Sequence, residues 1–209
     1  METVILARHG ESELSAAGVV SGDPAEPRGL TETGRGQARR LGEELAGEPI
    51  DLCVTSEFVR VRETADLALA GRDVPRLVVP ELNDVRFGDF EGKPFAEYRE
   101  WAGSRDPTEA PPGGESRAEV AARYVRGFRL VLARPKRTIL VVAHGLPLRY
   151  ALLALAGLDP TPIVEQVPLA TPYRLRRGEL ERVAERLERW SQAPVWVEAP
   201  PGFESERVG

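Results

Sequence analysis

Short apolar runs that alternate with helical patterns are the feature that most constrains how this chain can fold. Runs rich in Val, Ile and Leu predict buried strands at residues 4–7, 52–55 and 138–143, and a shorter run at 77–79 stops at Pro80. The segments between them have helical spacing. Strands that alternate with helices are typical of an α/β domain with a mostly parallel sheet. We therefore predict a three-layer α/β/α fold.

The predicted helices have identifiable starts. Thr31 is placed to cap a helix with Ala38, Leu41 and Leu45 on one face, and Ser116 to Glu119 has the form of a capping box. Further helices are expected at 57–70, 146–156 and 179–190. Short late strands are expected near Arg174 and at 195–197.

Length and composition limit the domain organisation. The 209 residues fit one domain, which we place at 1–200 with a cap insertion at about 86–114, followed by a flexible tail at 201–209. Residues 16–29 and 103–114 have the composition of loops, and both are long enough to be functional. The edge run at 77–79 could pair with a second copy, so a homodimer is one prediction.

Charge and cysteine usage exclude several classes of protein. The net charge of −5 argues against a nucleic-acid partner. Cys53 is the only cysteine and lies in an apolar run, which favours a small core residue over a nucleophile. The start of the chain has no signal-peptide pattern, and the apolar stretch at 146–158 is too short to cross a bilayer. We expect a cytoplasmic protein with no membrane partner.

Both histidines of the chain follow a predicted strand and precede a glycine. Arg8-His9-Gly10 ends the first strand, and His144-Gly145 ends the strand at 138–143. Ligands of open α/β sheets bind at the carboxyl ends of strands, where both histidines would emerge. Arg60 lies one turn into a helix that starts near the same edge. A lone histidine or arginine here is more often structural, but the repeated context favours a functional site.

The sequence resembles the histidine phosphatase superfamily, which has the phosphoglycerate mutase-like fold. Six blocks carry the resemblance, in order along the chain: Arg8-His9-Gly10-Glu11-Ser12; Leu30-Thr31-Glu32-Thr33-Gly34 with Gln37-Ala38; Ser56 with Arg60 and Thr64-Ala65; Leu82-Asn83-Asp84-Val85-Arg86-Phe87-Gly88 with Glu91-Gly92; Gly114-Glu115-Ser116; and Val142-Ala143-His144-Gly145 with Arg149. They cover roughly residues 3 to 150.

The resemblance implies a phosphomonoester hydrolase that acts on a small phosphorylated metabolite and needs no cofactor or metal. His9 would be the nucleophile and form a phosphohistidine. Arg8, Arg60 and His144 would contact the phosphoryl oxygens, with Ser15 and Gly145 completing the phosphate site. Asp84 would protonate the leaving oxygen and later activate water.

Some positions depart from the family pattern or leave alternatives. Asp84, and not Glu81, has the spacing to Phe87-Gly88 that the family's acid has, although Asn83-Asp84 could also be a plain turn. Ser15 and Ser21 stand where the family often has Asn and Gln, which affects substrate fit more than chemistry. Leaving-group specificity is expected from residues 16–29 and 87–114. Aromatic side chains in the second segment are expected mainly to pack it onto the core, and Arg86 is a candidate for binding an anionic leaving group.

Three other functions are weighed against hydrolysis. A metal site is disfavoured because it usually needs three or four ligands and Arg8 would repel a cation. A cofactor-dependent phosphoglycerate mutase usually has a longer, basic insertion after the Asp84 region, whereas the segment between Gly92 and Gly113 is short and acidic. A non-catalytic phosphate-binding regulatory module is disfavoured because Arg8, His9, Arg60, Asp84 and His144 are all present.

Overall fold

A computed structural model describes residues 1–163 and 165–197 of the chain. Along the sequence the elements are β1 (Thr3–Arg8), α1 (Glu13–Ala16), α2 (Glu32–Glu44), β2 (Leu52–Thr55), α3 (Val59–Ala68), β3 (Arg76–Val78), the 3₁₀ turns η1 (Pro80–Leu82) and η2 (Gly88–Phe90), α4 (Phe95–Gly103), α5 (Arg117–Leu132), β4 (Thr138–Ala143), α6 (Gly145–Leu155), β5 (Pro172–Arg176) and α7 (Arg177–Gln192).

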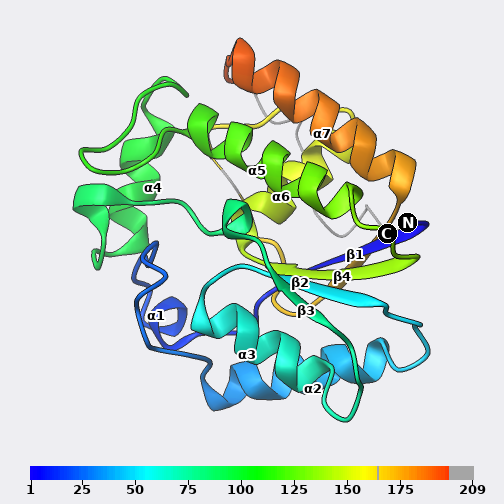
Figure 1. Ribbon diagram of the computed structural model, residues 1–209. Helices are drawn as coiled ribbons and strands as arrows, with labels where there is room; N and C mark the ends of the chain where they lie inside the picture. The colour runs from blue at the N-terminus through cyan, green and yellow to red at the C-terminus, as the bar shows by residue number, and fades with distance from the viewer. Residues whose placement is uncertain (164, 198–209) are drawn as a thin grey trace.

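The five strands form one mixed sheet in the order β3-β2-β4-β1-β5. The first four are parallel, and β5 at one edge is antiparallel to β1. Helices α2 and α3 cover one face, while α5, α6 and α7 cover the other (Figure 1). The predicted three-layer, mostly parallel α/β fold is confirmed.

The central strands are apolar because both of their faces are buried. In β1, Val4 and Leu6 pack in the core beneath α5, α6 and α7, while Ile5 and Ala7 pack against α2 and α3. Successive side chains of a strand point to opposite faces, so a strand covered on both sides must be apolar at each position. Cys53 is fully buried in the second of these cores, as predicted.

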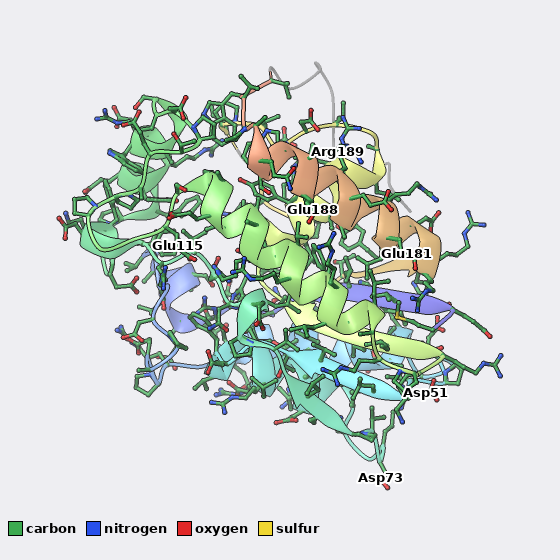
Figure 2. The ribbon with its side chains drawn as sticks, turned by 45° about the horizontal axis from the view of Figure 1, so that its top comes forward. Asp51, Asp73, Glu115, Glu181, Glu188 and Arg189 are labelled. Atoms are coloured by element: carbon green, nitrogen blue, oxygen red, sulfur yellow. The ribbon has the colours of Figure 1, made fainter. Side chains whose placement is uncertain are left out.

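Helix starts follow the capping signals in the sequence. The Thr31 side chain accepts a hydrogen bond from the Gly34 N–H, and Ser116 forms a reciprocal capping box with Glu119. Helix α7 is amphipathic: Leu180, Val183 and Leu187 are buried, whereas Glu181 and Glu188 are partly exposed and Arg189 is exposed (Figure 2).

Three details differ from the sequence-based predictions. The short helix α1 and the helix α4 were not predicted, and α4 lies inside the expected cap insertion. No strand forms at 195–197; the segment is instead tied to the rest of the molecule by two indole groups, since Trp190 donates to the Val195 carbonyl and Trp196 donates to the Arg105 carbonyl. The predicted tail at 201–209 lies outside the described residues. Among the described helices, none is long and apolar enough to cross a membrane.

Candidate active site

The carboxyl ends of β1 and β4 bring the two histidines together. Arg8 and Ala143 are paired in the parallel ladder, so His9 and His144 leave the sheet side by side. The His9 N–H donates to the Ala143 carbonyl at 2.9 Å, and the two imidazole centroids are 5.4 Å apart. Both histidines are buried. The predicted edge of the sheet is therefore where they meet.

The turn after His9 is held by helices α2 and α3. The Gly10 N–H donates to the Thr64 hydroxyl at 3.0 Å, and the Glu11 N–H donates to the Gln37 side-chain oxygen at 2.8 Å. A Cβ added to Gly34 would lie 2.0 Å from the Glu11 carbonyl oxygen, so only glycine allows α2 to approach the turn this closely. These residues of the second and third sequence blocks thus support the His9 backbone.

The contacts of His9 define its tautomer. Nδ1 lies 2.6 Å from the Gly10 carbonyl oxygen, which can only accept, so Nδ1 carries the proton. Arg60 Nε, which can only donate, faces Nε2 at 3.3 Å, so Nε2 carries a lone pair. Burial, followed by the positive charges of Arg60 and Arg8, holds the pKa of His9 well below its usual range. His9 is therefore neutral, with an unprotonated Nε2.

Arg60 connects the groups of the site. It lies in a helix after β2, as predicted, but because α3 begins at Val59 it is the second residue of that helix and not one turn into it; its guanidinium is buried. Nη2 donates to the Ser21 carbonyl at 3.0 Å and to Asp84 Oδ2 at 3.2 Å, and lies 3.2 Å from His144 Nδ1. Burial lowers the pKa of Arg60, while the Asp84 carboxylate opposes that effect.

His144 is fully enclosed behind Arg60. Its Nε2 is 2.9 Å from the Ser56 hydroxyl, and its ring packs edge-on against Phe58 with 4.6 Å between centroids. Asp84 Oδ2 is 3.4 Å from Nδ1. Burial, then the charge of Arg60, lowers the pKa of His144 well below its usual range. In a neutral His144 with its proton on Nε2, Nε2 donates to the Ser56 hydroxyl and the unprotonated Nδ1 accepts from Arg60 Nη2.

A buried ion pair between Arg123 and Glu115 positions the backbone of Asp84 without contacting the Asp84 carboxylate. Arg123 donates to the backbone carbonyls of Glu81, Asn83 and Asp84 at 2.8–3.0 Å. Two further donor contacts join Arg123 to the Glu115 carboxylate at 2.8 and 2.9 Å, and Glu115 is buried. The segment before Asp84 is thereby fixed on α5. Asp84 lines the pocket and Glu81 does not.

Arg8 is anchored by a segment far away in the sequence. Its Nη1 donates to the Gln166 side-chain oxygen at 3.0 Å and to the Val167 carbonyl at 2.8 Å. Its Nε is buried and has no hydrogen-bond partner in the described part of the chain. Gly145 lies beside this atom, since a Cβ there would be 3.4 Å from Nε. One donor of Arg8 therefore remains free next to the start of α6.

The two serines at the divergent positions have different surroundings. The Ser15 hydroxyl exchanges hydrogen bonds with Ser12 in the cap of α1, and the residue is exposed at the pocket. Ser21 is buried, and its hydroxyl accepts a long contact of 3.4 Å from Arg60 Nη1. Next to it, the Gly22 N–H donates to the Glu91 carboxylate at 2.9 and 3.0 Å. Ser21 thus helps to hold Arg60, while Ser15 faces the cavity.

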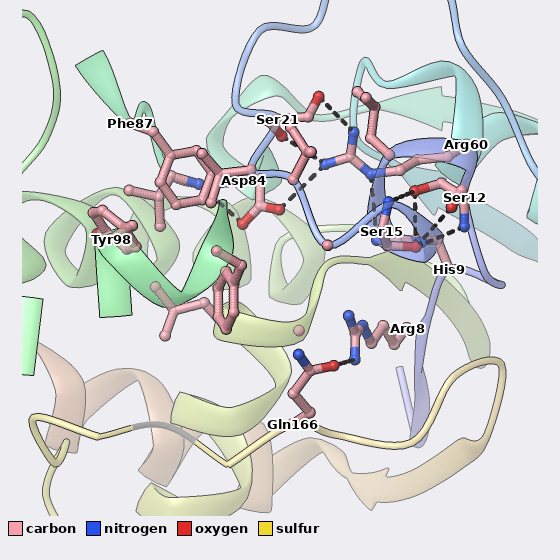
Figure 3. A pocket seen from close by; sticks show the side chains of 18 of the residues that line it. Arg8, His9, Ser12, Ser15, Ser21, Arg60, Asp84, Phe87, Tyr98 and Gln166 are labelled. Atoms are coloured by element: carbon pink, nitrogen blue, oxygen red, sulfur yellow. Dashed lines mark hydrogen bonds and ion pairs between the residues drawn. The ribbon is translucent and has the colours of Figure 1, made fainter. Parts of the chain in front are cut away.

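These groups border an open cavity of about 200 Å³. Arg8, His9, Ser15, Arg60, Asp84 and Gly145 line it, whereas His144 lies behind the wall. Its apolar side includes Val85, Phe87, Phe95 and Tyr98, and Phe87 and Tyr98 also belong to the core. Asp84 lies between Phe87 on one side and Arg60 on the other (Figure 3).

Sequence reasoning missed several residues at the site. Ser56 and Thr64 were matched to a sequence block but given no role, although Ser56 contacts His144 and Thr64 supports Gly10. Gln166 lies in a segment with no recognisable pattern. Arg86 does not line the cavity and is 3.6 Å from Glu115, so it is not placed to bind a leaving group. No cluster of three or more His, Cys, Asp or Glu suited to a metal ion occurs at 1–163 or 165–197.

Comparison with known sequences identifies the family. The sequence model of the histidine phosphatase superfamily (branch 1) matches residues 4–192. The chain belongs to this superfamily.

Individual superfamily members place the chain among phosphatases and mutases. The Salmonella typhimurium adenosylcobalamin/alpha-ribazole phosphatase is 50% identical over 86 residues, which is 41% of this chain and 42% of that enzyme. A 2,3-bisphosphoglycerate-dependent phosphoglycerate mutase from Bartonella henselae is 34% identical over 182 residues, covering 78% of this chain and 86% of the mutase. The alignment to the Salmonella phosphatase thus spans less than half of that enzyme's length.

A solved structure agrees with the fold. A mycobacterial glucosyl-3-phosphoglycerate phosphatase in complex with VO3 superimposes with a TM-score of 0.68 at 28% identity, covering 84% of this chain and 92% of that one. The chain is a histidine phosphatase superfamily enzyme with a phosphoglycerate mutase-like fold.

Proposed function

We propose that the protein hydrolyses a small phosphomonoester through a phosphohistidine on His9. The observation that carries the proposal is the His9 tautomer: Nδ1 is bound by the Gly10 carbonyl, which leaves the Nε2 lone pair at the wall of the cavity. A neutral imidazole is required for attack on phosphorus. The phosphatase names of the Salmonella and mycobacterial relatives support hydrolysis.

The first half-reaction transfers the phosphoryl group to His9. Nε2 forms a bond to phosphorus while the bond from phosphorus to the leaving oxygen breaks, and that oxygen takes a proton from Asp84. Arg8 and Arg60 are proposed as donors to the phosphoryl oxygens, since permanent guanidinium charges suit an anion whose charge spreads over three oxygens. His144, which was expected to be a third donor, lies behind the cavity wall with Nε2 at the Ser56 hydroxyl and Nδ1 at Arg60, so its proposed role is to hold Arg60 in place. Ser15 and Gly145 complete the phosphate-binding surface.

The second half-reaction returns the enzyme to its starting state. Asp84, now a carboxylate, takes a proton from a water molecule, and the water oxygen attacks the phosphohistidine. The nitrogen–phosphorus bond breaks, phosphate leaves, and His9 is again neutral. The position of Asp84 between Arg60 and the apolar side of the cavity supports the proposal that it acts in both steps (Figure 3).

A specific observation favours mutase activity as the second candidate: the Bartonella mutase aligns over most of its length. However, that alignment has 182 positions but uses 78% of the 209-residue chain, which is about 163 residues. The mutase therefore has roughly twenty residues within the aligned region that the chain lacks. The preference for hydrolysis rests on the short, acidic segment between Gly92 and Gly113.

The decisive test is phosphate release from p-nitrophenyl phosphate between pH 5 and 8, with a chelator present. We expect the wild type to release phosphate and His9→Ala to be inactive while retaining its fold by circular dichroism. Wild-type rates in His9→Ala would contradict the mechanism. Exchange between phosphoglycerates that requires added bisphosphoglycerate, without net phosphate release, would favour the mutase instead.

A further inference from the structure

Arg117 is a cation in the wall of the cavity that the phosphoryl chemistry does not use. It is the first residue of α5, directly after the capping residue Ser116. The capping box fixes this start of the helix and thereby places the Arg117 side chain at the apolar side of the cavity. A cation on an apolar wall calls for a counter-charge.

The neighbours of Arg117 are aromatic. Its guanidinium carbon lies 5.4 Å from the centre of the Tyr98 ring, and its Nε is buried without a hydrogen-bond partner. No carboxylate is paired with it within residues 1–163 and 165–197. An arginine guanidinium keeps its charge in proteins, and Tyr98, Tyr124 and Tyr150 supply no negative charge to pair with it, because burial raises the pKa of each phenol.

The place of Arg117 relative to Asp84 suggests what it binds. Phe87 and Tyr98 lie on the side of Asp84 opposite Arg60 (Figure 3), and Arg117 stacks on Tyr98. If Asp84 protonates the leaving oxygen, the leaving group occupies this apolar side. The other pocket arginines, Arg8 and Arg60, are held at the His9 end by Gln166, Ser21 and Asp84.

We propose that Arg117 selects phosphomonoesters whose leaving group combines an apolar portion with an anionic group, such as a carboxylate. The apolar portion would pack against Phe95 and Tyr98, and the anion would form charge-assisted hydrogen bonds with the Arg117 guanidinium. This specificity role rests on the proposed hydrolysis and concerns only the alcohol side of the ester.

The test compares two esters that differ in one charge. The first, 4-carboxyphenyl phosphate, carries the anion, and the second, 4-carbamoylphenyl phosphate, has nearly the same shape without it; the 3-substituted pair covers a second geometry. We expect the wild type to favour a carboxylate by at least about tenfold in kcat/KM, the effect of one hydrogen bond to a charged group. Arg117→Gln should lower that ratio about tenfold or more.

The matched control is Arg86→Gln, which removes an exposed arginine outside the cavity and should leave the ratio unchanged. Loss of packing or fold in Arg117→Gln would lower kcat/KM for both esters and leave their ratio intact. Three results would overturn the proposal. The first is a wild type without a carboxylate preference, and the second is an equal preference in Arg117→Gln. The third is turnover of p-nitrophenyl phosphate without turnover of either carboxyphenyl ester. Failure to hydrolyse any of these compounds would refute the proposed function itself.

Discussion

The stability of the protein should fall as the pH is lowered, because both of its histidines are buried and neutral. Burial, aided by Arg60, depresses the pKa of His9 and of His144 in the folded chain. In the unfolded chain each imidazole titrates near pH 6.5. Below that pH the unfolded state binds more protons than the folded state. The free energy of unfolding therefore decreases as the pH falls through this region and recovers above it.

The size of the effect follows from the number of histidines. Between pH 7.5 and 5.5, a histidine that protonates only when unfolded lowers the free energy of unfolding by about 1.4 kcal/mol. The chain has two histidines, so their limit is about 2.7 kcal/mol. Glu91 acts in the opposite direction, because burial raises its pKa, and removing the histidines separates the two effects.

Urea denaturation at pH 7.5 and 5.5 measures this dependence in the wild type, His9→Asn, His144→Asn and the double variant. We expect each single variant to lose about half of the histidine contribution and the double variant to lose all of it. A double variant whose stability changes with pH as much as that of the wild type would refute the reasoning. So would a wild type that is more stable at pH 5.5.

Three further predictions concern single residues. Asp84→Asn should lower kcat/KM, which reports the first half-reaction, by about 10²–10⁴-fold for alkyl phosphates and much less for p-nitrophenyl phosphate, since nitrophenolate leaves without a proton; equal losses in kcat/KM would argue against an acid role. Gly34→Ala should lower the free energy of unfolding by about 1–3 kcal/mol in urea, because its Cβ would meet the Glu11 carbonyl. Gly36→Ala in the same helix, which has nothing within 4 Å, should instead gain up to about 1 kcal/mol; equal losses would contradict this. Burial raises the pKa of Cys53 to about 12, so iodoacetamide at pH 8 should label it only in urea, and labelling of native protein would count against it.

The sequence predicted those parts of the fold that depend on local pattern. The strands at 52–55 and 138–143 have the predicted bounds, and Thr31 and Ser116 cap helices as expected. Helix α4 was missed although Pro94 precedes it and Phe95, Tyr98 and Ala102 recur at helical spacing. The aromatic residues of this segment were expected only to pack the cap onto the core, and Tyr98 and Ala102 are buried there.

The candidate site shows the same division between local and distant information. His9, His144 and Arg60 could be brought together from the sequence because each follows a strand that ends at one edge of the sheet. The anchor of Arg8 could not be predicted from the sequence, because Gln166 is 158 positions away and lies in a segment with no recognisable pattern. The tautomer of His9 could not be predicted either, because it depends on the orientation of the Gly10 carbonyl.

The most direct measurement is to trap the enzyme during turnover of ³²P-labelled p-nitrophenyl phosphate, denature it in alkali and map the labelled peptide. We expect a label that is stable to alkali, labile to acid, located on the peptide that contains His9, and absent from His9→Ala. Turnover with a label on His144 or another residue, or trapping of label by His9→Ala, would contradict the assignment of His9 as the nucleophile.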